Sequence, residues 1–324
     1  MDSIFRALAP LVAAGALLAA MPTAAQNYPN KVIHFIVPFA PGGSADLIAR
    51  TVGAKLADSV GQQVVVENRP AGGGQLGVEM TVNAAPDGYT LLVTPNGALS
   101  IARYMRQLPY DTATDLAPVS MLATIPAGIA VNAALPVKSL AEFIAYVKDR
   151  PGQLNYAVPT IGTHMHLAGE LLKSMTGMNI VAVPYKGTGP AAAALAAGEV
   201  QAAVADLASL LPFAGRGAIR ILAVADPKRT STAPDIPTAA EAGVPGYGVT
   251  AWIAMFAPVK TPAPVIAKLN AEVGRALQMA DVRDILIKAG IEPAPSTPED
   301  MRKILSDQIA GFGKVIKEAN IKFE

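Results

Sequence analysis

The chain has 324 residues, and its 26 Lys and Arg against 25 Asp and Glu give a formal charge of +1. This balance excludes the strongly basic surface by which proteins hold nucleic acids. Charged residues make up only 16% and apolar residues 52%, so the chain can bury a large core and is not predominantly disordered. The absence of cysteine excludes disulfides, thiolate metal sites and cysteine nucleophiles.

The N-terminus has the pattern of a secretory signal peptide. Arg6 precedes an uncharged apolar run over 7–21, which is shorter than the roughly 20 residues of a membrane helix. Small residues follow at 23–25. We therefore predict a signal peptide over 1–25, cleaved before Gln26, and a mature protein that is exported and acts outside the cytoplasm. The alternative is an uncleaved membrane anchor.

Downstream, short β-branched runs alternate with helical runs. A strand is expected over 32–37, where Pro38 ends it, and a helix follows the turn at 41–44. Further strands are expected at 64–66 and 91–93. Continuous apolar strands that alternate with helices predict a parallel sheet covered by helices.

A second α/β unit with the same alternation follows. Its expected strands are 155–158, 180–183, 200–205 and 219–224, and its expected helices are 165–176 and 190–197. The alanine-rich helix begins at Pro190 and is ended by Gly198, as helix propensities favour. The remaining segment, 264–321, has a helical pattern that is broken by a turn at 290–298.

Two proline-bearing strands, over 119–125 and 249–256, are candidates for crossovers between the units. The chain would enter the second unit near residue 126 and return near 251. We therefore predict an α/β clamshell in which lobe 1 comprises 27–125 plus 252–324 and lobe 2 comprises 126–251.

Five loops are expected at the carboxyl ends of the strands, where open α/β sheets bind their ligands. All contain small residues or hydroxyls, which let backbone N–H groups approach a ligand, and several lead into helix N-termini, which attract anions. The loops are 39–43, 94–97, 160–163, 186–189 and 206–209. Since Lys186 is their single cation, a bound carboxylate would be held mainly by backbone amides, hydroxyls and water.

Other patterns indicate chemistry less strongly. The run 72–77 matches the GxGxxG spacing but lacks the acid about 20 residues on that a dinucleotide site requires. His166 and Glu170 share a helix face next to His164, but without a third strong ligand we expect no metal. Asp206 lacks a partner base or nucleophile, so it suits a ligand amine or hydroxyl, or a loop cap, better than acid catalysis.

A series of motifs in order along the mature chain resembles the substrate-binding proteins of tripartite tricarboxylate transporters, the TctC or Bug family. The motifs are Val-Pro-Phe-Ala-Pro-Gly-Gly at 37–43 with Asp46 and Arg50, Glu-Asn-Arg-Pro at 67–70, Pro-Asp-Gly-Tyr-Thr at 86–90, Gly-Thr at 162–163 with 166–170, Val-Pro-Tyr-Lys-Gly at 183–187, Ile-Pro-Thr at 236–238 with 241–243, and the Trp252 segment. The loop at 94–97 departs from the family by being less rich in glycine and threonine.

The resemblance implies a periplasmic receptor with the two-lobed, type II-like fold of periplasmic binding proteins, each lobe a mainly parallel sheet flanked by helices. The lobes would close over a small carboxylate and deliver it to a large and a small integral-membrane subunit. Loop 39–43 would hold a carboxylate through main-chain groups and ordered water. The expected ligand-binding residues are Phe39, Ala40, Pro41, Gly42, Gly43, Asn96, Thr160, Ile161, Gly162, Thr163, His166, Lys186, Gly187, Thr188 and Asp206.

We expect a monomer that binds its ligand without chemistry, and so no catalytic residue, no metal and no cofactor. The preferred ligand is a mono- or dicarboxylate, with aromatic acids and amino acids left open. Two alternatives remain: an exported enzyme that acts on a small acid, and a receptor that reports its ligand to a membrane signalling partner.

Overall fold

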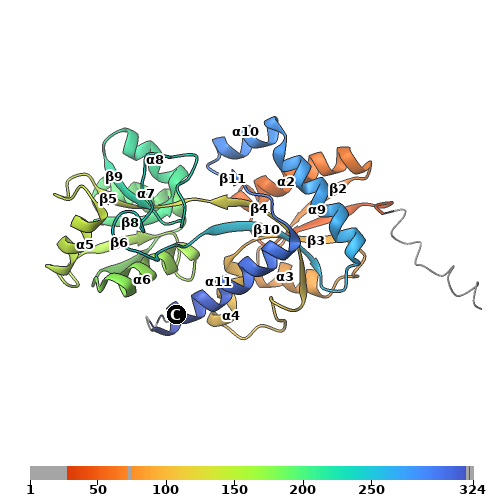
Figure 1. Ribbon diagram of the computed structural model, residues 1–324, viewed down its shortest axis with the longest axis horizontal. Coiled ribbons are helices and arrows are strands. Elements are labelled where there is room, and N and C mark those ends of the chain that lie inside the picture. The colour runs from red at the N-terminus through yellow and green to blue at the C-terminus, as the bar shows by residue number, and fades with distance from the viewer. Residues whose placement is uncertain (1–27, 72–73, 319–320, 322–324) are drawn as a thin grey trace, which may run out of the picture.

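Two β-sheets, each covered by helices, organise the part of the chain that the structure describes. This computed structural model describes residues 28–71, 74–318 and 321, so the expected signal peptide lies outside the described residues. Figure 1 shows two bodies side by side, and strands β4 and β10 reach from one into the other. Within the described residues, no helix is long and apolar enough to cross a membrane.

The first sheet has six strands in the order β11-β4-β10-β3-β1-β2. Strands β1, β2 and β3 are parallel, whereas β10 runs antiparallel to both of its neighbours. The strands are β1 (Ile33–Val37), β2 (Val64–Asn68), β3 (Thr90–Pro95), β4 (Leu116–Ile125), β10 (Ala251–Pro258) and β11 (Glu292–Pro293). The helices of this part are α2 (Ser44–Val60), α3 (Gln75–Val82), the π-helical turn η3 (Gly97–Ile101), α4 (Ala102–Met105), α9 (Ala263–Gln278) and α10 (Ala280–Lys288).

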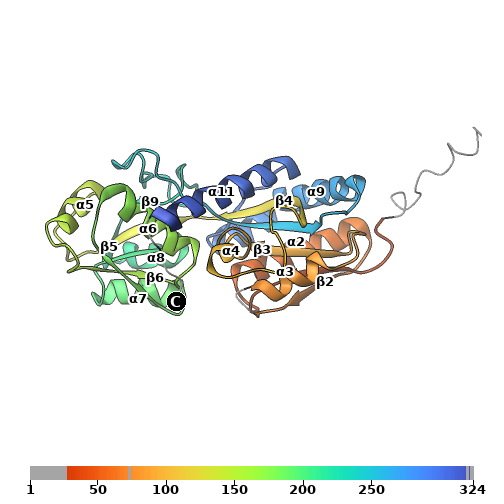
Figure 2. The same ribbon diagram turned by 90° about the horizontal axis from the view of Figure 1, so that it is seen from below.

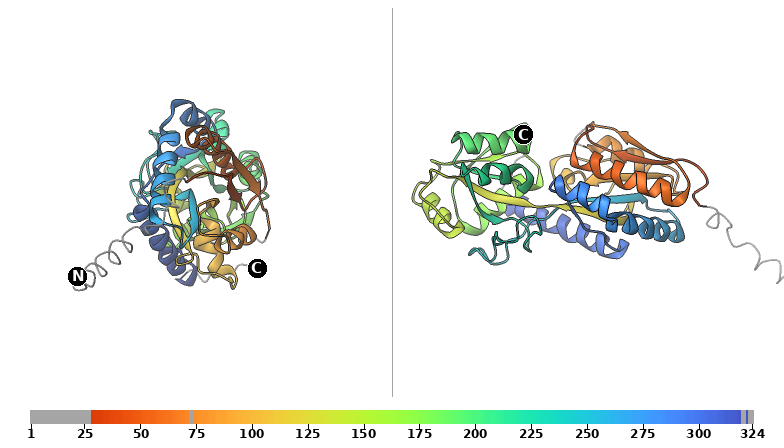
Figure 3. Two further views of the ribbon diagram at one scale, coloured as in Figure 1. Left: turned by 90° about the vertical axis from the view of Figure 1, so that its right-hand side faces the viewer. Right: turned by 90° about the horizontal axis from the view of Figure 1, so that it is seen from above.

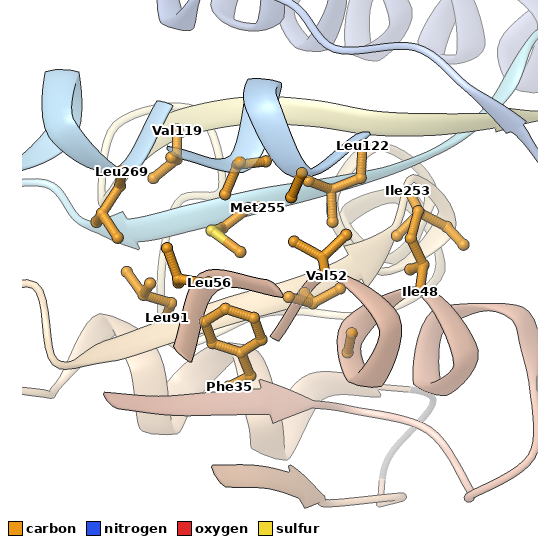
Figure 4. Packing of buried hydrophobic residues seen from close by; sticks show 14 of the residues in the cluster. Phe35, Ile48, Val52, Leu56, Leu91, Val119, Leu122, Ile253, Met255 and Leu269 are labelled. Carbon is orange, nitrogen blue, oxygen red and sulfur yellow. The ribbon is translucent and has the colours of Figure 1, made fainter. Parts of the chain in front are cut away.

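The core of this lobe lies between the sheet and helices α2 and α9. In α2, Ile48, Val52 and Leu56 recur every four residues, so they share one helix face, and all three are fully buried. They pack against Phe35 of β1 and Met255 of β10 (Figure 4). Each such side chain contributes about 1.5–3 kcal/mol of hydrophobic stabilisation, and together they fix the position of α2.

The second sheet has five strands in the order β7-β6-β8-β5-β9. Strands β6, β7 and β8 are parallel, and β5 runs antiparallel to β8 and β9. The strands are β5 (Ala127–Asn132), β6 (Asn155–Val158), β7 (Val181–Pro184), β8 (Ala202–Asp206) and β9 (Ile219–Val224), and the helices are α5 (Leu140–Lys148), α6 (His164–Thr176), α7 (Thr188–Ala197) and α8 (Leu207–Gly215).

The chain crosses between the sheets twice. Only Pro126 separates β4 in the first sheet from β5 in the second, and the return leads from β9 to β10. The two views of Figures 1 and 2 agree that β4 and β10 run side by side where they leave the first body. Two α/β lobes joined in this way confirm the predicted fold class.

A third connection comes from the last helix, α11 (Pro298–Glu318). Its early residues Met301 and Leu305 pack with Trp252 in the first lobe, whereas Phe312 joins the core of the second lobe around Tyr156. Figures 2 and 3 show α11 passing from one body to the other. The helical pattern of 264–321 was predicted, but this bridging role was not.

Three elements of the second lobe were missing from the expected set, namely β5, α5 and α8. Three of the six residues of β5, namely Ala127, Gly128 and Ala130, have a low preference for strands and give a weak strand signal. Helix α5, by contrast, has a capping box that could have been recognised. The Ser139 hydroxyl accepts a hydrogen bond from the Glu142 N–H, and the Glu142 carboxylate accepts one from the Lys138 N–H.

Candidate functional site

In both sheets, the carboxyl ends of the parallel strands lie on the side where the chain crosses between the lobes. In the first lobe, β3 ends beside the start of β10, where Pro95 is paired with Ile253. In the second lobe, Asp206 at the end of β8 is paired with Ala127, the first residue after the crossing. The loops beyond these ends therefore lie at the junction between the lobes, where open α/β sheets bind ligands.

The loop 39–43 connects β1 to α2 and is held in place by side chains behind it. The Gly42 N–H donates to Asp46 Oδ2 at 2.9 Å, and the Asn68 amide donates to both the Phe39 carbonyl and Asp46 Oδ1. Gly42 has a φ of +85°, which favours glycine. Phe39 is half-buried, and residues 40–43 are exposed in front of the first turn of α2. Backbone N–H groups of that turn lack helical partners and can meet an anion.

Asp46 is a support of this loop and not a free anion. Burial alone would raise the pKa of its carboxyl, but hydrogen bonds from Arg50, the Gly42 N–H and Asn68 outweigh burial and hold the pKa below its ordinary value. Its side chain is 7% exposed and pairs with Arg50 at 2.9 Å. The motif residues Asp46, Arg50 and Asn68 thus fix the geometry of the 39–43 loop.

Glycine is also required behind the same loop, at Gly77 of α3. A Cβ at this position would lie 2.7 Å from Pro38 Cβ, so α3 approaches the end of β1 only because Gly77 has no side chain. This packing explains part of the glycine-rich run at 72–77. Gly72 and Gly73 of that run lie outside the described residues.

Asn96 is fully buried, and most of its hydrogen bonds go to the return crossing into β10 and to helix α11. Its Nδ2 donates to the Thr250 carbonyl at 3.2 Å and to Gln308 Oε1 of α11 at 3.1 Å, and its N–H donates to the Trp252 carbonyl. Oδ1 is buried without a partner in the described part of the chain. Of the side chain, only this oxygen is left for a ligand.

In the second lobe, the hydroxyls of loop 160–163 shape the loop itself. Thr160 donates to the Pro159 carbonyl, and Thr163 donates to the Thr160 carbonyl and caps α6 by accepting from the His166 N–H. His166 is buried, and its Nδ1 accepts from the Gly162 N–H at 3.3 Å. This loop can therefore offer a ligand its backbone more readily than its hydroxyls. Ile161 is half-buried against the core of the second lobe.

Loops 160–163 and 186–189 are brought together at the edge of the second sheet. The Gly187 N–H donates to the Pro159 carbonyl at 3.1 Å, and α7 begins at Thr188 directly afterwards. Lys186 is exposed at this edge, so it is available to an incoming anion. Thr188 Oγ1 accepts a hydrogen bond from the Ser209 hydroxyl at 3.0 Å.

Asp206 occupies the N-cap position of α8, yet its side chain makes no capping hydrogen bond. The Asp206 side chain therefore does not cap α8. One oxygen, Oδ1, is buried and has no partner in the described part of the chain. Burial raises the pKa of this carboxyl to about 6, although a hydrogen bond from Thr188 opposes the shift. An unpaired buried carboxylate oxygen is costly, and such groups cluster at functional sites.

His164, the first residue of α6, was not among the predicted site residues. Its Nε2 is buried without a hydrogen-bond partner among the described residues, and burial lowers the pKa of its imidazole to about 4. A neutral imidazole at the start of α6 can donate to or accept from a ligand. The sequence analysis chose His166 because it shares a helix face with Glu170, and no comparable pattern indicated His164.

Two further observations concern a possible metal site and a separate cavity. No cluster of three or more His, Cys, Asp or Glu side chains that could hold a metal occurs in 28–71, 74–318 and 321. A cavity of about 650 Å³ lies between α6, α11 and the start of β10, where Met175, Thr250 and Phe312 contribute to its wall. None of the fifteen predicted site residues, all of which are described, lines this cavity.

Two hinged α/β lobes, with small-residue loops and helix N-termini gathered at their junction, define a two-lobed solute-binding protein. The chain belongs to the family of receptors of tripartite tricarboxylate transporters, whose family model, TctC, matches residues 48–321. This family consists of periplasmic substrate-binding proteins and not of enzymes. Membership confirms the resemblance and the functional class predicted from the motifs.

Relatives of this family align over nearly the whole chain. Protein BugT of Bordetella pertussis is 38% identical over 307 residues, which cover 94% of each chain. Among solved structures, R. palustris Rpa4515 with adipate is 37% identical with a TM-score of 0.77 and covers 91% of this chain and 99% of that one. MatC from Rhodopseudomonas palustris with bound malate is 34% identical with a TM-score of 0.72 and covers 89% of this chain and all of that one.

Proposed function

We propose that this protein captures a small organic carboxylate between its lobes and delivers it to the large and small membrane subunits of a tripartite tricarboxylate transporter. The proposal is supported by the strand ends beside the crossings: Pro95 at the end of β3 pairs with Ile253, Asp206 at the end of β8 pairs with Ala127, and the Gly187 N–H joins loop 186–189 to the Pro159 carbonyl before loop 160–163. Helices α2, α6 and α7 begin at these loops, and their unpaired N–H groups suit a carboxylate. The solved relatives with adipate and malate support this ligand class.

The proposed ligand contacts are the backbone and side-chain groups of each loop that are not already hydrogen-bonded within the described part of the protein. Residues 39–43 present the backbone of the first lobe, and 160–163 with 186–188 present that of the second. Asp206 and Oδ1 of Asn96 add acceptors, and exposed Lys186 adds a cation. His166 supports loop 160–163 from behind.

Binding by closure requires no chemistry. A ligand that touches both lobes stabilises only the arrangement in which the lobes meet around it. A micromolar Kd corresponds to about −8 kcal/mol, which several charge-assisted hydrogen bonds in a dehydrated junction can supply. The lobes are proposed to divide at 126 and 251, giving 27–125 plus 252–324 and 126–251, and the receptor is proposed to act as a monomer.

The proposed place of action is the periplasm, after removal of residues 1–25. The apolar run at 7–21 and the small residues before Gln26 support export and cleavage there. Sequencing the N-terminus of the protein isolated from the periplasm tests the cleavage site. Uptake into vesicles that carry the two membrane subunits, with and without the loaded receptor, tests delivery.

Thermal unfolding with a panel of small carboxylates tests the binding function. The exported protein is first unfolded and refolded to remove any bound ligand. A ligand at 100 times its Kd stabilises the fold by about 2.7 kcal/mol, which raises the midpoint by several degrees in a protein of this size. An unfolding midpoint that no mono-, di- or tricarboxylate raises would contradict the proposal.

The Gly43→Val substitution tests whether loop 39–43 forms part of the ligand-binding site. An added Cβ at Gly43 meets no atom closer than the Ala40 carbonyl at 3.8 Å, so the fold accommodates it while the side chain blocks ligand approach. We expect at least a tenfold loss of affinity, measured by calorimetry. Gly274→Val in α9 is the matched control, because a Cβ there also meets nothing within 4 Å. Equal affinities of the two variants would show that loop 39–43 is not in the site.

A further inference from the structure

The carboxyl group of Asp206 lies between the first turns of α7 and α8. It receives a hydrogen bond from Thr188, the first residue of α7, and the Thr188 hydroxyl in turn accepts from Ser209 of α8 at 3.0 Å. The Ser209 hydroxyl thus leaves the Thr188 hydroxyl free to donate its hydrogen to the Asp206 carboxylate. The polar chain Ser209, Thr188, Asp206 therefore ends in an acceptor.

The second oxygen, Oδ1, takes no part in that chain and accepts no hydrogen bond from the described residues. It is buried, and no donor of the described residues reaches it. The helix next to it does not use it as a cap, and no lysine or arginine among the described residues forms an ion pair with this carboxylate. A buried acceptor without a partner is unfavourable unless something outside the chain supplies a hydrogen.

The position of Oδ1 indicates where that hydrogen comes from. Asp206 is the last residue of β8 and is paired with Ala127 directly after the crossing, which places this residue at the junction between the lobes. The loops around it offer mainly N–H groups, which suit the carboxylate of a ligand. Asp206 offers the opposite, because an acceptor-only carboxylate repels a second carboxylate and attracts a hydroxyl or an ammonium group.

We propose that Asp206 Oδ1 accepts a hydrogen bond from a hydroxyl or ammonium group of the ligand, so that this receptor prefers a hydroxy- or amino-substituted carboxylate over an unsubstituted one. The inference rests on the proposed function, because it places a small carboxylate in the junction. It adds an orientation: the carboxylate meets the backbone N–H groups, and the donor substituent meets the second lobe at Asp206. The site thereby rejects analogues that leave Oδ1 unpaired.

Three four-carbon acids that differ by one substituent test this inference. Succinate has no donor, malate has a hydroxyl and aspartate has an ammonium group, and calorimetry with the refolded exported protein gives the three affinities. We expect malate, aspartate or both to bind at least tenfold more tightly than succinate. A stronger effect of aspartate identifies an ammonium group, and a stronger effect of malate identifies a hydroxyl.

Asp206→Asn tests the residue. The amide keeps the shape of the side chain but removes the charge that repels a second carboxylate, so we expect the preference over succinate to fall at least tenfold and succinate to bind no more weakly than to the wild type. Without ligand, the variant should unfold at a temperature no lower than the wild type, because a buried unpaired charge has been removed. Asp226→Asn is the matched control, since Asp226 lies on the other side of Ala127, and it should retain the preference.

The outcomes separate this inference from the proposed function. A wild-type protein that binds succinate as tightly as malate and aspartate remains a carboxylate receptor and overturns the role of Asp206. Retention of the preference in Asp206→Asn overturns it as well, and so indicates that water satisfies Oδ1. A protein that binds no carboxylate in the wider panel overturns the proposed function and this inference with it.

Discussion

At the scale of single residues, two buried carboxyls flank the first residue after the crossing, and they do different work. Asp206 Oδ1 is buried and has no hydrogen-bond partner among the described residues. Asp226 is bonded to the first crossing, because its Oδ2 accepts a hydrogen bond from the Ala127 N–H at 3.3 Å. Burial raises the pKa of Asp226 to about 7, hydrogen bonds from Ala127 and Thr250 oppose the shift, and the nearby Glu292 carboxylate adds to it.

This raised pKa predicts a pH-dependent stability. The folded protein holds the Asp226 proton to a higher pH than the unfolded chain does, so this residue's contribution is complete below about pH 4 and is lost as the pH rises through about 7. Asp226→Asn cannot ionise, so the variant should gain stability relative to the wild type between pH 5 and 8. Thermal unfolding midpoints at both pH values measure this difference. The exposed Asp235→Asn is the control, and an identical pH dependence of Asp226→Asn and wild type would refute the prediction.

At the scale of elements, the two-residue strand β11 ties the first lobe to the second. Glu292 Oε1 accepts from the Ser231 hydroxyl at 2.8 Å, from the Thr232 N–H at 3.0 Å and from the Thr230 hydroxyl. These donors belong to the segment between β9 and β10, whereas β11 pairs with β4 in the first sheet. Burial would raise the pKa of Glu292, but the hydrogen bonds outweigh it and hold the pKa below its ordinary value.

Removal of this contact should release the segment at 227–235. We expect Glu292→Ala to destabilise the protein by about 1–2 kcal/mol, near the lower end for hydrogen bonds to a charged group, because the side chain is only half-buried. Trypsin should then cleave faster after Lys228 or Arg229, which limited proteolysis and mass spectrometry detect. Glu318→Ala, at an exposed position near the end of α11, should show neither change. Unaltered cleavage of Glu292→Ala would mean that other contacts hold the segment.

Helix α11 is the second element that spans the lobes. Gln308 at its centre donates to the Thr250 carbonyl at 2.9 Å and accepts from Asn96, so the helix is fastened to the return crossing. Its two ends pack into different cores, at Met301 and at Phe312. Any change in the angle between the lobes must therefore be accommodated along this helix.

At the scale of the whole molecule, the two crossings and α11 leave the lobes as separate bodies joined along one side (Figure 3). Small-angle scattering should show a smaller radius of gyration when a bound carboxylate is saturating, because a ligand held by both lobes favours their approach. Gly43→Val at the same ligand concentration should keep the radius of the ligand-free protein. An unchanged radius for the fully liganded wild type would contradict binding by closure.

The sequence predicted the lobes and their loops because those signals are local. Strand periodicity located β1, β6 and β9 to within a residue, and the crossings were expected within three residues of the ends of β4 and β10. Loops at carboxyl ends follow from parallel strands without knowledge of packing. Strand β5 was missed because glycine and alanine carry little strand preference, and burial between β8 and β9 is what makes it a strand.

The sequence by itself determined the fold class, the family and the set of loops from which a site can be built. Tertiary structure decided which polar groups remain free, because hydrogen-bond partners lie far apart in the chain. Asn96 Nδ2 donates to the Thr250 carbonyl and to Gln308 Oε1, which lie 154 and 212 residues away in the chain, so neither N–H of its side chain is left for a ligand. Asp206 is bonded by Thr188, but its Oδ1 has no partner among the described residues, and no local pattern encodes that difference.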